Sequence, residues 1–318
     1  MARRARVGIS ALSDVARMDT APAAYHLGFM LGPRINAGGR VGKADLGARL
    51  LATNDPHEAA ALSEKLDTLN SERRDVENAV RAAALAQAEE RGTDGALVWA
   101  AGKGWHPGVV GIVAARLKEA TGRPAVVIGL EDGIGKGSGR SVSGIDLGAC
   151  IQKLAFKGVL LKGGGHKMAA GLTVEEDKLE EAMTALGALL EKQGVHLLGP
   201  SNLRLDGILM PDAASVELTQ AIESAGPFGA GAPAPRYVFA GMRIFSARRV
   251  GESHLKVSFG DGHGRRLDAI SFGAFDSALG PALEAHGGAR FHLAGRLDIN
   301  TWQGRQSVQL RLEDASRA

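Results

Sequence analysis

The stretch that decides the fold reads Ala96-Leu97-Val98-Trp99-Ala100, then Gly104-Trp105-His106-Pro107-Gly108, then Ala125-Val126-Val127-Ile128-Gly129. The first and third runs are short and apolar, which is typical of buried strands. The turn between them leads into a predicted helix, Val109 to Ala120. A strand, a helix and a second strand within about 35 residues predict a βαβ unit with parallel strands.

A long helix is predicted just before this unit. Asn54-Asp55-Pro56 supplies a capping side chain and a proline suited to the first helical turn. The segment from there to about Arg91 contains no glycine and no further proline, and its apolar residues recur at helical spacing. It carries nine acidic and five basic residues. We therefore expect a connecting helix of roughly 35 residues that does not follow a phosphate backbone.

The pattern changes after Gly199-Pro200-Ser201-Asn202. Five short strands are predicted beyond it, with one helix, Asp276 to Ala285, between the third and the fourth. The strands are Arg236 to Phe245, His254 to Phe259, Leu267 to Phe272, Phe291 to Leu297 and Ser307 to Leu312. This order predicts an OB-type barrel.

Three segments combine glycines with cationic and hydroxyl side chains, and we interpret them as loops. They are Gly32-Pro33-Arg34-Ile35-Asn36-Ala37-Gly38-Gly39-Arg40, Gly135-Lys136-Gly137-Ser138-Gly139-Arg140-Ser141 and Gly163-Gly164-Gly165-His166-Lys167. Bare amides, hydroxyls and fixed cations can bind phosphate oxygens. Residues 135–171 contain six Lys or Arg against one acid, a local charge of +5 in a chain of +3. The alternative for each segment is an ordinary turn or hairpin with incidental charges.

The barrel segment is basic, with twelve bases and eight acids in residues 235–318. Its cations and aromatics predict a groove for a single strand with stacking surfaces, although most aromatics of a small barrel belong to its core. The candidate groove residues are Arg248, Arg249, Lys256, Arg265, Arg266, Phe245, Phe259 and Trp302. Trp302, beside Gln303 and Gly304, is the best candidate for an exposed ring.

The bulk composition narrows the class of protein. A hydrophobic content of 45% and a charged content of 23% are typical of a folded globular protein. The single cysteine, Cys150, excludes an intramolecular disulfide and suits a reducing cytoplasm. No apolar run reaches 18 residues, so we expect no membrane span. The nine histidines are scattered, and the sequence predicts no metal site formed by this chain alone.

Several motifs, in order, resemble the RecJ family of single-strand-specific 5′-to-3′ exonucleases in the DHH phosphoesterase superfamily. The motifs are Leu31 to Arg40, Gly104 to Ile112, Gly137 to Ser141, Gly163 to His166 and Gly226-Pro227-Phe228-Gly229. They span essentially the whole chain. Their number and order make the resemblance specific.

The resemblance implies an α/β chain that ends in an OB-fold barrel. Residues 1–53 would be the C-terminal remnant of a DHH catalytic domain, 54–92 the connecting helix, 93–197 a DHH-associated nucleic-acid-binding domain and 198–318 the OB fold for single-stranded DNA. The implied nucleic-acid-binding residues are Arg34, Asn36, Arg40, Ser138, Arg140, Ser141, Gly164, Gly165, His166 and Trp302. Arg34 and Arg40 would contact the DNA backbone, and the glycine segments would hold phosphates near the 5′ end.

The chain departs from the family at the metal site. Family members hydrolyse DNA with Mn²⁺ or Mg²⁺, held by aspartates and histidines that include an Asp-His-His motif upstream of the Gly-Pro-Arg segment. Here that region offers Asp14, Asp19 and His26 in no such arrangement. We therefore expect a truncated cytoplasmic chain that binds single-stranded DNA, binds no metal by itself, does not cleave DNA, and has no membrane partner.

Two alternatives remain open. A standalone non-catalytic protein could bind single-stranded nucleic acid through the same two domains. An upstream reading frame that encodes Asp-His-His would instead indicate a separately encoded DHH domain as a partner. The second, weaker alternative is a small-oligonucleotide phosphoesterase, but such an enzyme has no need of a basic barrel.

Overall fold

The structure is a computed structural model that describes residues 4–19, 24–195, 202–229, 231–262 and 264–318, with the Trp302 side chain outside the description. The chain forms two compact units, residues 1–201 and 202–318. Each unit is described by itself below.

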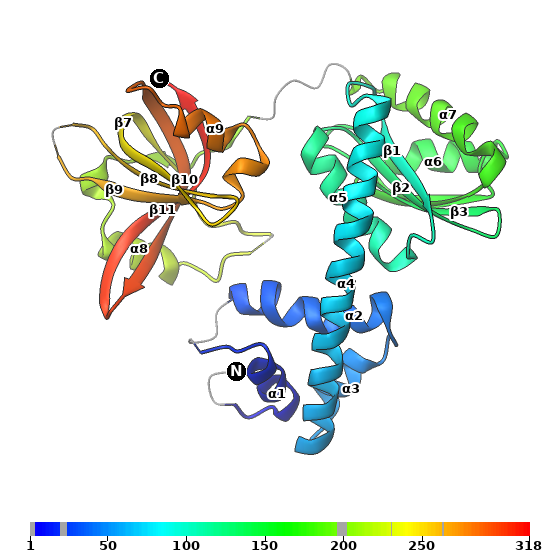
Figure 1. Cartoon of the computed structure of the whole chain (residues 1–318), viewed down its shortest axis with the longest axis horizontal. Coiled ribbons are helices and arrows are strands. Elements are labelled where there is room, and N and C mark those ends of the chain that lie inside the picture. Colours follow the sequence, from blue (N-terminus) through cyan, green and yellow to red (C-terminus); the bar gives the residue numbers. More distant parts are fainter. Residues whose placement is uncertain (1–3, 20–23, 196–201, 230, 263) are drawn as a thin grey trace. The chain divides into compact units, whose positions relative to one another are not determined.

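Three short helices pack around the first half of one long helix in the first unit (Figure 1). They are α1 (Val7–Val15), α2 (Gly32–Val41) and α3 (Leu46–Ala52), and the long helix is α4 (Pro56–Arg91). The π-helical η1 (His26–Leu31) leads directly into α2 and contacts it. Asp55 caps α4 by accepting a hydrogen bond from His57 N at 2.8 Å, as the sequence predicts. Among the described residues, no helix has the length and apolarity needed to cross a membrane.

The two halves of α4 belong to two different cores. Leu62, Leu66 and Leu69 pack with apolar residues of α1 to α3. Val80, Ala84 and Ala88 pack instead with the sheet that follows and with its helix α5 (Pro107–Thr121). The long helix is therefore fixed to both cores by ordinary apolar burial.

The sheet of the first unit has the strand order β1-β2-β3-β5-β4. Its strands are β1 (Val98–Lys103), β2 (Ala125–Glu131), β3 (Ile134–Arg140), β4 (Lys162–His166) and β5 (Ala169–Glu175). β1 and β2 pair in parallel, so the predicted βαβ unit is confirmed. The other pairs are antiparallel.

Helices cover the two faces of this sheet differently. On one face, named the α5 face, α5 packs on β2 and β3, and α4 reaches β1. The other face is covered by α6 (Leu147–Phe156) and by α7 (Leu179–Glu191), which follows the short 3-10 turn η2 (Glu176–Lys178). Sequence reasoning missed α6.

The three glycine-rich segments are not loops, which corrects the sequence interpretation. Gly32 to Arg40 lies in α2, Gly135 to Arg140 lies in β3, and Gly163 to His166 lies in β4. In β3 the glycines make room for neighbouring side chains, because a Cβ on Gly137 would lie 2.8 Å from Ile128 Cγ1 and 3.0 Å from Leu172 Cδ1.

The second unit is a closed barrel, which confirms the predicted OB fold. Its main strands are β7 (Tyr237–Val250), β8 (His254–Gly260), β9 (Leu267–Ser271), β10 (Arg290–Trp302) and β11 (Arg305–Arg317), and pairing of β10 with β7 closes the ring. Its smaller elements are β6 (Gly207–Ile208), η4 (Pro211–Ala213), α8 (Val216–Ser224), η5 (Ala274–Asp276) and α9 (Leu279–Glu284). The last two strands are longer than the sequence predicts.

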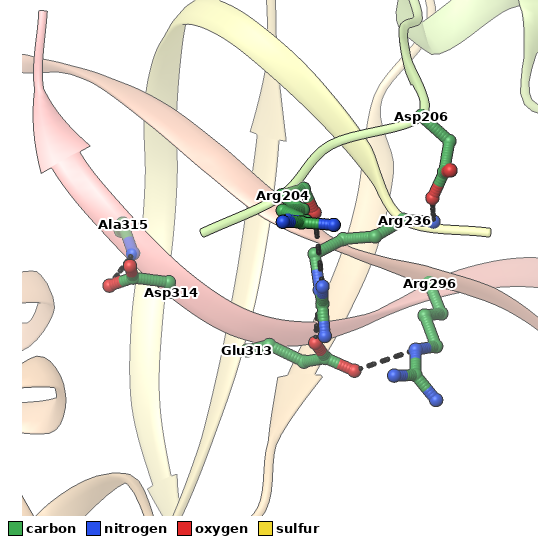
Figure 2. A network of polar contacts seen from close by, with 7 residues as sticks. All are labelled: Arg204, Asp206, Arg236, Arg296, Glu313, Asp314 and Ala315. Carbon is green, nitrogen blue, oxygen red and sulfur yellow. Dashed lines mark hydrogen bonds and ion pairs between the residues drawn. The ribbon is translucent and has the colours of Figure 1, made fainter. Parts of the chain in front are cut away.

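A charged network holds the start of β7 against the barrel wall (Figure 2). Glu313 accepts from Arg236 Nε at 2.6 Å and pairs with Arg296 Nε at 3.0 Å. Arg236 also donates through its guanidinium to Arg204 O, and its backbone N–H donates to Asp206. One carboxylate thus neutralises two arginines, Arg236 just before β7 and Arg296 on β10, so these two serve the fold.

Candidate nucleic-acid interface

Strand β3 places a row of polar side chains on the α5 face. Because successive residues of a strand point to opposite faces, Lys136, Ser138 and Arg140 share one face. The register sets Ser138 and Arg140 beside Val127 and Ala125 of β2, which pack under α5. The two predicted phosphate ligands, Ser138 and Arg140, therefore lie at the edge of α5.

Arg140 is held in place by its own strand and by a gap in α5. Its Nη1 donates to Ser138 Oγ and to Gly139 O, each at 2.9 Å. A Cβ on Gly111 of α5 would lie 2.9 Å from Arg140 Nη2 and 3.1 Å from Ser138 Oγ. The absence of a side chain at Gly111 thus allows the guanidinium and the hydroxyl to lie against the helix.

Arg40 approaches the same place from α2. Its Nη1 donates to Gly108 O at 3.1 Å, and a Cβ on Gly108 would lie 2.1 Å from Arg40 O. Burial lowers the pKa of the Arg140 guanidinium, and the nearby charge of Arg40 lowers that pKa further. Among the described residues, neither arginine forms an ion pair with a carboxylate.

Sequence reasoning missed further arginines beside Arg40. Burial lowers the pKa of Arg73 on α4, Glu77 opposes this as its ion-pair partner, and Arg40, Arg74 and Arg116 lower that pKa again. We name Arg40, Arg73, Arg74, Arg116 and Arg140 the arginine cluster. The excess of acidic over basic residues in α4 concealed this cluster in the sequence, because only the folded helix shows which side chains approach α2.

Beyond β3, the α5 face exposes bare backbone. Gly171 of β5 pairs with Ser138, and Gly164 of β4 pairs with Gly171. Gly171 is exposed, and a Cβ on Gly164 would meet no atom within 4 Å. His166 and Lys162, both exposed, lie on either side of Gly164 on the same face. The result is a smooth strip about 10 Å across, given the usual strand spacing, with cations at its borders.

The remaining predicted ligands of the first unit lie elsewhere. The Arg34 guanidinium donates to Asp67 Oδ1 at 2.7 Å and to Met30 O at 2.8 Å, which ties α2 to α4. Ser141 is 1% exposed and donates to Ile145 O at 2.9 Å. Gly165 packs against Ala169 and Ala170 within the β4–β5 hairpin. Asn36 is exposed on α2, one turn before Arg40.

The barrel presents a second candidate surface on its exterior. Register places Arg248, Lys256, Ile270 and Arg311 side by side across β7, β8, β9 and β11. At the end of this row Phe272 is 58% exposed, with the Arg311 guanidinium 5.4 Å from its ring centroid. His254 meets the ring edge-on. We name these six residues the barrel row.

The aromatics predicted for the barrel groove divide between core and surface. Phe259 is fully buried against Phe239, which corrects its interpretation as a stacking residue. Phe245 is half-buried under the Arg266 guanidinium. Trp302 ends β10, but its side chain lies outside the described part. Phe272 was missed because it is the last residue of the predicted strand Leu267 to Phe272, where the sequence does not distinguish an exposed ring from a core ring.

The described residues do not form a metal centre. Nowhere in that part of the chain do three or more His, Cys, Asp or Glu side chains come together in a way that could hold a metal ion. A divalent ion of the kind that hydrolyses phosphodiesters needs several oxygen or nitrogen ligands at one point. These residues therefore do not fit such an ion, and we derive no chemical step through one.

Comparison with known families divides the chain as the fold does. Residues 94–192 match the DHHA1 domain, and residues 205–314 match the RecJ OB domain. The first match contains the sheet with its α5 face, and the second contains the barrel row. The α5 face and the barrel row thus fall within recognised domains, whereas Arg40, Arg73 and Arg74 of the arginine cluster lie before the first match.

Comparisons over the whole of this chain point to one group of proteins. The chain is 39% identical over 328 aligned residues to the single-stranded-DNA-specific exonuclease RecJ of Escherichia coli, and 30% identical over 321 to that of Bacillus subtilis. These alignments cover 98% and 99% of the chain but 55% and 40% of the two relatives. The chain therefore spans about half the length of the curated relatives it matches.

Solved structures agree with these relatives. The crystal structure of RecJ from Thermus thermophilus in complex with Mn²⁺ matches 99% of the chain at a TM-score of 0.79 and 29% identity. The same enzyme in complex with Mg²⁺ matches 98% of the chain, also at 0.79. The chain covers 44% and 46% of those two structures.

Proposed function

Because the chain belongs to the RecJ family, we propose that it is the DNA-binding portion of a single-stranded-DNA-specific 5′-to-3′ exonuclease for repair and recombination. One observation carries the proposal. Arg40 and Arg140 lie close together and partly buried, with no carboxylate to neutralise them among the described residues. Two desolvated like charges repel each other, so an anion between them would relieve an existing cost.

A terminal phosphate is an anion of suitable chemistry for this site. Arg140 offers a planar fork of donors, which suits phosphate oxygens. Ser138 adds a hydroxyl, and the exposed strip at Gly171 and Gly164 lets a backbone pass close to the strands. We assign binding of the 5′ phosphate to Arg40, Arg140 and Ser138, and binding of the adjoining chain to the strip, with His166 and Asn36 at its approaches.

The proposal leaves out Arg34, Ser141 and Gly165, whose polar groups or packing serve the fold. It adds the barrel row as a second contact with single-stranded DNA. There Arg248 and Arg311 would attract phosphates, since Lys256 is paired with Asp268 at 2.9 Å, and Phe272 would stack on a base. Binding should weaken as salt rises, because each neutralised phosphate releases counterions.

The main test replaces Arg140 by alanine. Arg140→Ala should weaken binding of a 5′-phosphorylated single strand by about tenfold or more, the size of a lost charge-assisted contact. The affinity for a 5′-hydroxyl strand should fall much less. Lys153→Ala is the control, since it removes one charge from α6 on the opposite face of the sheet. Equal losses for both strands in a fluorescence-anisotropy titration would refute 5′-phosphate binding.

We further propose that these 318 residues bind DNA without cleaving it. The supporting observation is the lack of a ligand set for a divalent ion in the described part. The metal ligands would come from further polypeptide, such as a DHH domain encoded separately. With Mn²⁺ added, purified chain should leave a 5′-labelled single strand intact on a denaturing gel. Degradation that disappears in Arg140→Ala would contradict this expectation.

A further inference from the structure

A pocket on the α5 face is not used by the phosphate site. It lies beyond the N-terminal end of α5, has a volume of about 310 Å³, and is lined chiefly by Trp105, His106, Pro107, Leu130, Ile134 and Lys136. Known ligand pockets begin at about this size. Since Lys136 belongs to the same strand face as Ser138 and Arg140, the pocket and the phosphate site lie along one strand.

The wall of this pocket is fixed by backbone packing. A Cβ on Gly102 would lie 2.2 Å from the Trp105 indole, and a Cβ on Gly129 would lie 2.2 Å from Trp105 O. His106 caps α5, with Nδ1 accepting from Gly108 N at 3.0 Å. Gly108 is also the residue whose carbonyl receives Arg40. The pocket and the phosphate site therefore share one rigid turn.

The chemistry of the lining suits a flat, uncharged group. Trp105 and His106 supply rings, and Leu130 and Ile134 supply apolar walls. Glu131 and Asp132 also border the pocket and would repel a phosphate. Lys136 supplies a donor for a ring nitrogen or carbonyl. Nucleobases stack on aromatic side chains and present polar edges, so they meet these conditions.

We propose that this pocket binds the base of a nucleotide close to the 5′ phosphate, an inference that rests on the proposed function. Phosphate binding by Arg40 and Arg140 would place the strand end on β3. The base would then enter between the Trp105 turn and the β2–β3 hairpin. The pocket thereby anchors the end of the strand by a neutral contact that high salt does not screen.

The test is an abasic scan with the full chain. Short 5′-phosphorylated single strands, each with one abasic site at a successive position from the 5′ end, are titrated by fluorescence anisotropy. An abasic site at one position near the 5′ end should lower the affinity for the strand by about tenfold, as expected for the loss of one stacked base. A uniform response across the positions would overturn the inference.

A pocket-filling variant makes the test specific. Ile134→Trp should lower the affinity for the intact strand by about tenfold. Its affinity for the strand that is abasic at the sensitive position should equal that of the unmodified chain. Thr184→Trp, which adds the same ring to a surface pocket on α7, should bind both strands like the unmodified chain. If Ile134→Trp weakened both strands equally, the pocket would not bind a base. Melting curves for both variants exclude a folding defect.

The outcomes separate the two proposals. A uniform scan would refute the pocket alone if Arg140→Ala still weakened binding of the 5′-phosphorylated strand more than binding of the 5′-hydroxyl strand. Equal losses for the two strands in Arg140→Ala, with one sensitive abasic position, would refute the phosphate site and keep the base pocket as an independent site. Absence of DNA binding would overturn both.

Discussion

At Gly111 the missing side chain leaves room for the Arg140 guanidinium, because a Cβ there would approach Nη2 to 2.9 Å. At Gly108 it leaves room for the backbone of Arg40, which a Cβ would approach to 2.1 Å. The two positions differ in what must move. The guanidinium is the end of a flexible side chain, whereas the Arg40 carbonyl belongs to a packed helix.

Gly111→Ala should therefore separate stability from binding. Alanine in a helix interior is favoured over glycine by about 0.5–1 kcal/mol, so the free energy of unfolding should hold or rise. Affinity for a 5′-phosphorylated strand should fall several-fold, because Arg140 is displaced from Ser138. Gly187→Ala in α7, where the nearest atom lies 3.9 Å away, should stabilise without weakening binding. Chemical denaturation and anisotropy measure the two quantities, and unchanged affinity in Gly111→Ala would refute the packing role.

At the scale of elements, a side-chain amide of α4 adds a pair of hydrogen bonds to the apolar packing of this helix on the sheet. Gln87 Nε2 donates to Ala101 O at 2.9 Å, and its Oε1 accepts from Ala101 N at 3.1 Å. The pair resembles a short piece of strand pairing, because it satisfies both backbone groups on the outer edge of β1. It thereby occupies part of an edge that could otherwise pair with another chain.

Gln87→Ala should lower the free energy of unfolding by about 1–3 kcal/mol, because two backbone groups lose their partners. The amide of Ala101 should also exchange faster with solvent deuterium. Gln152→Ala on the exposed side of α6 makes the same change without such bonds and should have little effect. Equal stability of the two variants would show that the amide bonds contribute nothing.

Local signals predicted some elements and failed for others. The cap at Asp55 and the apolar spacing of α4 lie within one segment, so the sequence shows them directly. The glycines of α2 reflect tertiary packing, since a Cβ on Gly38 would lie 2.9 Å from Lys43 O and 3.3 Å from Leu66 Cδ2. Likewise the glycines of β3 leave room for Ile128 and Leu172, which lie on the neighbouring strands, and the local sequence around the glycines does not reveal these contacts. The sequence predicted Ser138 and Arg140 as ligands, whereas Arg73 and Phe272 could be identified only from the structure.

At the scale of the whole molecule, the two units offer two different kinds of contact. The first combines the arginine cluster with bare backbone, and the barrel row combines spaced cations with the exposed ring of Phe272. Joining two binding surfaces in one chain raises the overall affinity beyond that of either, provided both engage the same strand. The loss of one surface should then weaken binding without abolishing it.

Phe272→Ala tests the barrel row in the full chain. Affinity for a single strand should fall by about tenfold, equally for 5′-phosphate and 5′-hydroxyl ends, because the ring would stack on bases and not on the terminus. Phe156→Ala removes a ring that is 94% exposed on α6 and should leave binding unchanged. An effect that depended on the 5′ phosphate would contradict the assignment of Phe272 to general strand contact.

The unbroken course of α4 has a consequence for insertions and deletions. Removing one residue between Leu69 and Val80 would turn one core about 100° relative to the other and shorten their separation by about 1.5 Å. Arg40 would then no longer face Gly108, although neither residue had changed. Adding or removing about seven residues restores the phase of the helix but changes the separation of the cores by about 10 Å, so we expect every length variant in this stretch to lose the contact between Arg40 and Gly108.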